Sequence, residues 1–227
     1  RDSQGYTPLT SSARQRNSAL VKLLLNLGSN PNIRDGNDMT PLLEAVMRDD
    51  VPSIELLLAH GADKAVLGPE GIDALGLAIE ERKYEAAKDL IKAGAKVNVP
   101  VGEQRLTPLM ITAAETAPAE GAVFLPSGTR PIDIAKLLIQ RGADVNSKDK
   151  TGMTALMVAA SHNDAPMVGL LLQSGAEASA KNDQGQTAID IAKLNGNLEA
   201  AQAISVLGKT RSAAETSASS QPSPDTN

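Results

Sequence analysis

Few side chains in this chain could do chemistry, and histidine is the scarcest of them. His60 and His162 are the only histidines, they stand far apart, and cysteine is absent. A zinc site needs several His or Cys ligands, and neither histidine has a partner at H-x-x-x-H spacing. We therefore expect both histidines at the surface, no metal site and no cofactor.

No residue pattern indicates catalysis without a metal either. A Ser-His-Asp arrangement needs a base within hydrogen-bond reach and an acid that orients it, and no motif indicates one. Glu80 and Glu81 are neighbouring acids, but adjacent residues on a helix point in different directions. No phosphate-binding G-x-x-x-x-G-K or G-x-G-x-x-G loop follows a strand pattern. We predict that the chain is not an enzyme.

Composition excludes further classes. The 227 residues carry a net charge of −5, which argues against a nucleic-acid binder. No apolar run approaches the roughly 18 residues of a membrane span. Abundant alanine and the lack of cysteine favour a soluble bacterial chain, in the cytoplasm or the periplasm. Because the chain starts at Arg1 and not at methionine, we expect further residues upstream.

The elements that must position any functional residue repeat along the chain. Similar octapeptides, among them YTPLTSSA, MTPLLEAV and MTALMVAA, place their second residue at 7, 40, 73, 107, 154 and 187. The steps are 33, 33, 34, 47 and 33 residues. A Gly-Ser or Gly-Ala pair follows that residue after 21 positions in four copies and after 35 in the fourth, which therefore carries 14 extra residues.

Each copy predicts a pair of helices. Threonine before proline is a helix start, because the hydroxyl caps free backbone N–H groups and proline suits the first turn. A second helix with paired aliphatic residues follows, and the glycine ends it in the left-handed conformation. Asp, Asn and Gly then favour a tight reversal. Since one pair cannot bury its apolar face alone, the copies must stack as a solenoid.

This pattern resembles the ankyrin repeat. DGNDMTPLLEAV, GADVNSKDKTGMTALMVAA and KNDQGQTAIDIAK carry the resemblance, and the third copy departs from it with Asp73-Ala74 in place of Thr-Pro. The resemblance implies an all-α fold of six repeats over residues 1–208. The repeats span about 2–34, 35–67, 68–101, 102–148 with the insertion, 149–181 and 182–208. The Ser-rich segment 209–227 cannot bury an apolar face, so we expect a disordered tail.

The resemblance also implies a concave protein-binding surface made of hairpin tips and first helices. The residues that precede each Thr-Pro match are mostly apolar or amphipathic, which indicates an interface, although they could simply pack on neighbouring hairpins. Residues at the ends of the first helices flank them. The predicted contact residues on this surface are Tyr6, Arg14, Met39, Met47, Arg48, Ile72, Glu80, Glu81, Leu106, Glu115, Met153 and His162.

Charge is uneven along this surface. Residues 1–34 hold five basic and one acidic side chains, a net +4, whereas residues 35–66 hold two basic and seven acidic ones, a net −5. Such an asymmetry would orient a charged partner more than it would tighten binding. Solubility alone would also account for it.

The extra residues of the fourth copy lie within 116–130, between its first and second helices. Loops of this length are usually functional or disordered. Phe124, the single phenylalanine, and Leu125 could form an apolar prong that docks on a partner or covers the stack. A neutral insertion is the alternative, since its entropy penalty grows only slowly with length.

We therefore expect a non-catalytic protein-binding module that presents a rigid surface to a partner of unknown identity. The alternative is an accessory or regulatory subunit that stabilises or inhibits one enzyme complex. The leucine-rich segment ALVKLLLNLG favours this alternative, because it makes a poor polar end cap and suits a permanent neighbour or a further repeat.

Overall fold

The computed structural model describes residues 1–3, 5–115 and 128–218, with Glu70 and residues 209–218 as backbone only. Twelve α-helices and one short 3-10 helix, η1, form in these ranges. In chain order they are α1 (Pro8–Arg14), α2 (Ser18–Asn26), α3 (Pro41–Met47), α4 (Val51–Ala59), η1 (Pro69–Gly71), α5 (Ala74–Glu80), α6 (Tyr84–Lys92), α7 (Pro108–Ala114), α8 (Pro131–Gln140), α9 (Ala155–Ser161), α10 (Ala165–Gln173), α11 (Ala188–Leu194) and α12 (Leu198–Ala218).

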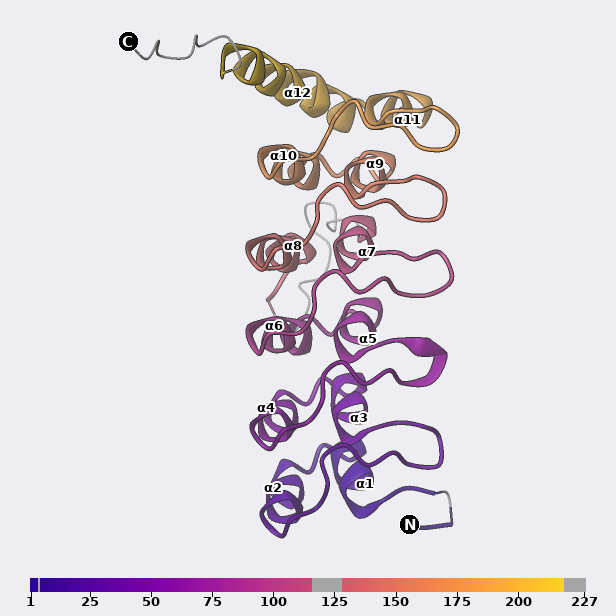
Figure 1. The fold of residues 1–227 in the computed structure, drawn as a ribbon, viewed down its shortest axis with the longest axis vertical. Coiled ribbons are helices and arrows are strands. Elements are labelled where there is room, and N and C mark those ends of the chain that lie inside the picture. The colour runs from indigo at the N-terminus through magenta and orange to yellow at the C-terminus, as the bar shows by residue number, and fades with distance from the viewer. Residues whose placement is uncertain (4, 116–127, 219–227) are drawn as a thin grey trace, which may run out of the picture. The chain divides into compact units, whose positions relative to one another are not determined.

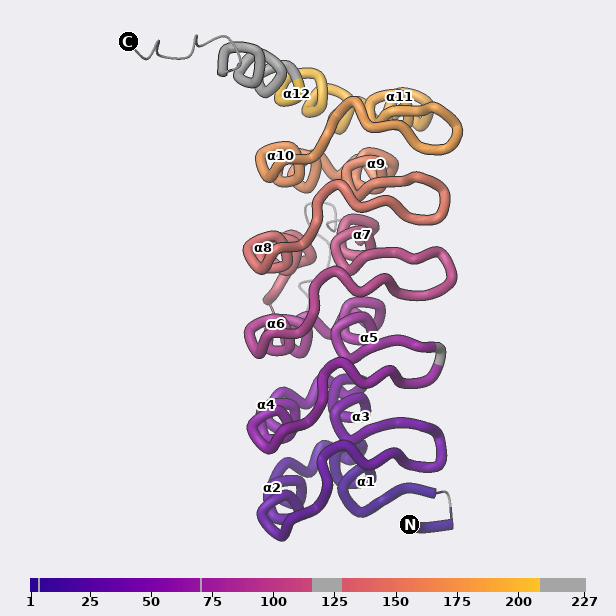
Figure 2. Tube along the Cα trace, in the orientation of Figure 1, coloured from indigo at the N-terminus to yellow at the C-terminus, as the bar shows by residue number. Residues whose placement is uncertain are grey.

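The first compact unit, Arg1–Asp144, is a stack of four helix pairs. Its first helices α1, α3, α5 and α7 pack in sequence order, and its second helices α2, α4, α6 and α8 do the same beside them. Figure 1 shows these two columns, and Figure 2 shows the hairpin turns projecting beyond the column of first helices. The predicted all-α repeat architecture is confirmed.

The second compact unit, Val145–Asn227, contains two further pairs. Within it α9 packs on α10 and α11, and α12 packs on α10 and α11. The last helix differs from the prediction, because α12 continues to Ala218 and passes the boundary at Gly208 where we expected the tail to begin. Alanine and glutamate in SAAETSA are good helix formers, which accounts for the extension.

Each first helix begins at the residue that the repeat pattern predicts. Thr40, Thr107 and Thr154 each accept a hydrogen bond from the backbone N–H three residues on, at 3.2–3.3 Å. In the third repeat Asp73 takes the same role and accepts from the N–H of Gly76 at 2.8 Å. The substitution of Thr by Asp therefore changes the capping group and keeps the helix start.

Aliphatic residues and alanine fill the core of both units. Leu42, Leu75 and Leu109, at equivalent positions of α3, α5 and α7, are at most 1 % exposed. Ala45 and Ala78 stand five residues after the cap residues of α3 and α5, and they are fully buried where neighbouring helices approach closely. A core with almost no aromatic residues is thus closed by short side chains.

The outer side of α2 stays open in the first unit. Leu20, Leu23 and Leu27 lie on this helix or directly after it and are 38 %, 54 % and 74 % exposed. This agrees with the sequence-based expectation that the first repeat is a poor polar end cap. The insertion also lies where predicted, between α7 and α8.

Candidate functional site

The hairpin face is our name for the surface between the hairpin turns and the C-terminal ends of the first helices. The predicted turn residues of this face are all half-buried. Part of each side chain is buried and part stays accessible, which is compatible with both interpretations of this row. These residues are Tyr6, Met39, Ile72, Leu106, Met153 and Gln186.

An apolar hollow opens on the hairpin face of the first unit, between α3 and α5. Its volume is about 280 Å³. Five predicted contact residues line it together with Leu43, Leu77, Gly68 and Pro69. We call it the methionine hollow. The five predicted residues are Met39, Met47, Ile72, Glu80 and Glu81.

A second hollow, of about 420 Å³, lies beside it between α1 and the end of α3. We call it the arginine hollow, because Arg14 and Arg48 line it with Tyr6, Asp2, Ser11 and Gln15. The guanidinium carbon of Arg14 stands 4.6 Å from the centre of the Tyr6 ring, a cation–π contact. The Tyr6 hydroxyl in turn accepts a hydrogen bond from the Asn37 side-chain amide at 3.0 Å.

A buried carboxyl accompanies the two arginines. Glu44 of α3 is 6 % exposed. Burial raises the pKa of Glu44, while the charges of Arg14 and Arg48 act against that shift and the charge of Asp35 adds to it. The two guanidinium groups thus favour the ionised form of Glu44, and burial disfavours it.

Among the described residues of the first unit, two predicted contact residues, Leu106 and Glu115, lie outside both hollows. The Glu115 carboxylate pairs with the Arg82 guanidinium at 2.6 Å, and the Glu115 side chain is 13 % exposed. Burial and the nearby Glu115 charge raise the pKa of the Tyr84 hydroxyl. Glu115 thus links α7 to the start of α6. Leu106 pairs its backbone with Val101 in an antiparallel bridge inside its own hairpin.

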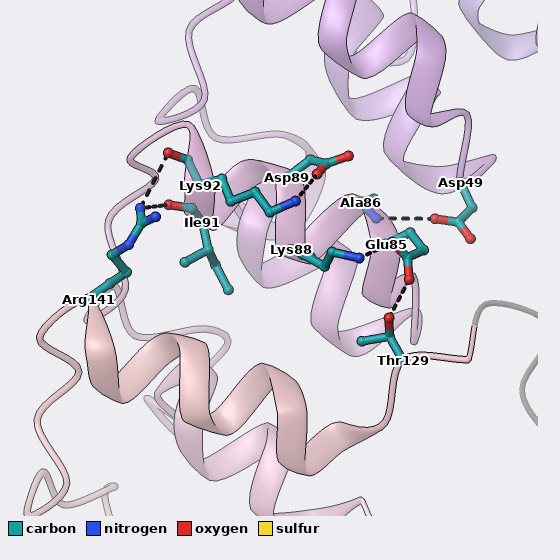
Figure 3. A network of polar contacts seen from close by, with 9 residues as sticks. All are labelled: Asp49, Glu85, Ala86, Lys88, Asp89, Ile91, Lys92, Thr129 and Arg141. Carbon is teal, nitrogen blue, oxygen red and sulfur yellow. Dashed lines mark hydrogen bonds and ion pairs between the residues drawn. The ribbon is translucent and has the colours of Figure 1, made fainter.

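The insertion is tied to the third repeat at its described flanks. Before it, Glu115 binds Arg82. After it, the Thr129 hydroxyl donates to the Glu85 carboxylate, which also pairs with Lys88 at 2.7 Å (Figure 3). Phe124 and Leu125, the residues of the predicted prong, lie outside the described residues.

A separate polar network, drawn in Figure 3, lies on the second helices of the first unit. Arg141 donates to the carbonyl of Ile91 at 2.6 Å, and the Asp49 carboxylate accepts from the N–H of Ala86 at 3.4 Å. The first contact joins the end of α8 to α6. The second joins α6 to the turn after α3. They stabilise the stack and do not form part of the hairpin face.

The second unit has one described hollow of about 420 Å³ at its hairpins, lined by Met153, Gln186 and Ile191 with Thr151 and residues 182–184. The amide of Asn182 donates to the Met153 sulfur at 3.7 Å and to the Gln186 carbonyl oxygen at 3.0 Å. Met153 therefore lies at an accessible hollow, and its role as a contact residue stays a prediction.

Both histidines are exposed, as predicted. His162 lies 3.1 Å from the Ser161 hydroxyl, a contact that could suggest a nucleophile and its base. However, Ser161 donates to the carbonyl of Val158 at 2.8 Å, and Nδ1 of His162 lies 3.0 Å from the same carbonyl oxygen. Within the described residues no carboxylate hydrogen-bonds to the His162 ring, so this pair lacks the orienting acid of a hydrolase.

The sequence analysis missed a row of asparagines that join successive turns. Asn98 donates to the carbonyl of Gly142 at 2.9 Å and accepts from the N–H of Asp144 at 2.9 Å. Asn32 makes the equivalent pair with Gly61 and Asp63, at 3.1 and 2.7 Å. Asparagine recurs at this position in PNI, VNV and VNS, so the repeat alignment held a signal for it.

Helix pairs that stack through aliphatic cores and are joined by hairpin turns define a solenoid repeat protein. A family profile described as ankyrin repeats, in three copies, matches residues 9–101 and 121–209. The match covers more than half of the chain, and the chain belongs to the ankyrin-repeat family. Members of this family are protein–protein interaction modules and generally not enzymes.

Curated relatives are similar over part of their length. An ankyrin repeat protein of Acanthamoeba polyphaga mimivirus is 26 % identical over 163 residues, 72 % of this chain and 20 % of the relative. The ankyrin repeat protein YahD of Escherichia coli K12 is 27 % identical over 159 residues, 70 % of this chain and 74 % of the relative. The chain therefore spans about a fifth of the viral relative's length.

Solved structures share the fold. A chain in the complex of a predatory endopeptidase from Bdellovibrio bacteriovorus with an immunity protein has a TM-score of 0.73 and 28 % identity, over 88 % of this chain and 98 % of that one. An ankyrin repeat domain from Acinetobacter baumannii reaches a TM-score of 0.76 at 22 % identity, over 88 % and 97 % of the two chains.

The described residues contain neither a candidate membrane span nor a candidate metal cluster. No helix there is long and apolar enough to cross a membrane. No group of three or more His, Cys, Asp or Glu side chains there could hold a metal ion.

Proposed function

We propose that the chain is a non-catalytic module that binds a protein partner through its hairpin face. One observation carries the proposal: five residues predicted as contacts from sequence spacing converge on the methionine hollow. Met39 and Met47 give it an adaptable apolar lining, and the stacked helices hold it in a rigid frame. A standard interface uses roughly 800 Å² per partner.

Affinity capture from cells that express the protein tests this proposal. The bait is the full chain, and the face variant carries Met39→Asp and Met47→Asp, which put charge into the hollow. The control variant carries Lys22→Glu and Glu55→Lys, at exposed positions of α2 and α4. The main partner should be lost from the face variant and kept by the control. Equal recovery from both would place binding elsewhere and contradict the proposal.

A second candidate function is that of an accessory subunit that stabilises or inhibits one enzyme. Two observations favour it: the exposed leucines of α2, and the similarity to a chain in a complex of an endopeptidase with an immunity protein. A fixed-stoichiometry complex that survives purification, in which the partner enzyme's activity changes when this chain is added, would favour it. A partner that dissociates on dilution favours the transient module.

The insertion is proposed as a second contact element. The test is Phe124→Ser with Leu125→Ser, which keeps the loop length and the anchors Glu115 and Thr129. An unchanged melting temperature with loss of the partner supports a recognition role. A large fall in melting temperature would assign these side chains to the fold, and no change in either would indicate a neutral loop.

A further inference from the structure

Two hollows of opposite character meet at the C-terminal end of α3. Met47, the last residue of α3, lines the methionine hollow, and the next residue, Arg48, lines the arginine hollow. Exposed Glu80 and Glu81 stand at the end of α5 on one side, and exposed Arg14 stands at the end of α1 on the other. The face therefore has an acidic apolar half and a basic polar half.

Three of the charged groups that line these hollows form no ion pair in the described residues, whereas some charged groups elsewhere in the first unit do. Arg34, Arg82 and Lys88 are each paired with a carboxylate at 2.6–2.8 Å. By contrast, within the described part of the chain neither Arg14 nor Arg48 forms an ion pair, and neither does Glu81. These groups keep their charge available to another molecule.

The arginine hollow suits a carboxylate. Guanidinium groups bind carboxylates through two parallel hydrogen bonds, and such charge-assisted bonds are about twice as strong as neutral ones. The Tyr6 ring under Arg14 holds one of the two guanidinium groups at the rim. Ser11 and Gln15 line the same hollow with further donors, and Asp2 adds one carboxyl group against the two guanidinium groups.

The methionine hollow suits an apolar side chain with a cation beside it. Its apolar lining of Met39, Leu43 and Ile72 suits an aliphatic side chain. Glu81 at its edge would attract a lysine or arginine next to that side chain.

We propose that the hairpin face of the first unit binds a dipolar peptide segment of a protein partner, with an apolar side chain and a neighbouring cation in the methionine hollow and a carboxylate in the arginine hollow. This inference rests on the proposed function and adds the partner's chemistry and direction. A segment bound in reverse would bring like charges together, which would weaken binding.

Selection from a displayed library of random peptides of about twelve residues, which extend to roughly 40 Å, tests the proposal. The full chain is the bait, and Arg48→Glu and Glu81→Lys are the face variants. Lys22→Glu and Glu55→Lys, on α2 and α4, are the matched controls, and a melting curve verifies that each variant folds. No native partner is needed.

The parent chain should enrich peptides with an acid, an apolar residue and a base in a constant order. Arg48→Glu should remove the preference for the acid, Glu81→Lys should remove the preference for the base, and both controls should keep the parent pattern. For one synthesised peptide from the selection, each reversal should weaken Kd by about tenfold at low salt, and added salt should reduce the difference.

Three results would overturn the inference: no enriched peptides, enriched peptides without a charge pattern, or the same pattern with all variants. Failure of the inference can be told from failure of the proposed function. If Met39→Asp with Met47→Asp abolishes capture of a partner while both charge reversals leave it intact, the face binds proteins and the dipolar assignment is wrong.

Discussion

At the scale of single residues, the candidate site depends on where charges are buried and where they stay accessible. Glu44 is buried beside the arginine hollow, whereas Arg14 and Arg48 are exposed. Spacing predicted the two arginines because the pairs Arg14-Gln15 and Met47-Arg48 occupy equivalent positions of successive repeats. The buried carboxyl between them could not be predicted, because spacing alone does not say which side of a short helix faces the stack.

Because Glu44 is buried, the ionisation of its carboxyl group makes the stability of the folded protein depend on pH. Its pKa is raised above the ordinary value of 4.5, so the folded protein keeps this proton to higher pH than the unfolded chain does. Stability therefore falls as pH rises from the unfolded pKa through the folded one. Glu44→Gln imitates the protonated form, and its advantage over the parent in urea unfolding should grow between about pH 4 and about pH 7. Glu55→Gln, exposed on α4, is the control; an advantage that shrinks with pH would contradict the assignment.

Arg16 occupies a backbone conformation that favours glycine. Its φ is 57°, in the turn between α1 and α2, and glycine stands at the equivalent position in the last repeat, Gly196 with φ 72°. Arg16→Gly should raise the free energy of unfolding by about 0.5–1 kcal/mol, because the left-handed region costs an L-residue that much or more. Lys22→Gly, inside α2, should instead lower it by about 1 kcal/mol. Losses of stability in both variants would contradict this account.

At the scale of elements, short helices depend on their caps, since an isolated helix of seven residues is unstable in water. Thr154 is 2 % exposed and caps α9 in the second unit. Thr154→Ala should cost about 1 kcal/mol in thermal or chemical unfolding, and Thr154→Ser should recover most of that loss. Equal destabilisation by Ala and Ser would show that packing of the methyl group, and not the cap, is what matters.

The turns of neighbouring repeats are joined by asparagine. Asn98 makes two hydrogen bonds to the turn after α8, at 2.9 Å each. Asn98→Ala should lower the free energy of unfolding by about 1–2 kcal/mol. The nearby Lys96→Ala, which changes an exposed side chain of the same turn, should have almost no effect. A neutral Asn98→Ala would mean that water replaces both bonds without loss.

Helix starts and ends were the most predictable elements. Thr before Pro, paired leucines and a terminal glycine each act within one repeat, so the sequence contains them directly. The contact between Arg82 and Glu115 was not predictable, because it joins the turn after α5 to the end of α7 across 33 residues of sequence. For the same reason Glu115 was expected on the hairpin face, and the structure places it in an ion pair outside both hollows.

At the scale of the whole chain, repetition made the fold easy to predict. A 33-residue period fixes the helix pairs, their order and the side from which hairpins project. The hollows depend on differences between repeats, such as Met47 followed by Arg48 where another repeat has Glu80 and Glu81. Those differences give the two halves of the hairpin face opposite charge. Neither the repeat period nor the fold specifies the partner.

Site-specific photocrosslinking in living cells tests the central claim most directly. Benzoylphenylalanine replaces Met47 on the hairpin face of the first unit in one variant and Glu55 on its second helices in another. Both melting temperatures are compared with that of the parent. The account predicts a discrete crosslinked protein from position 47 and none from position 55. Crosslinks from position 55 alone would contradict it, and would place the binding surface on the second helices.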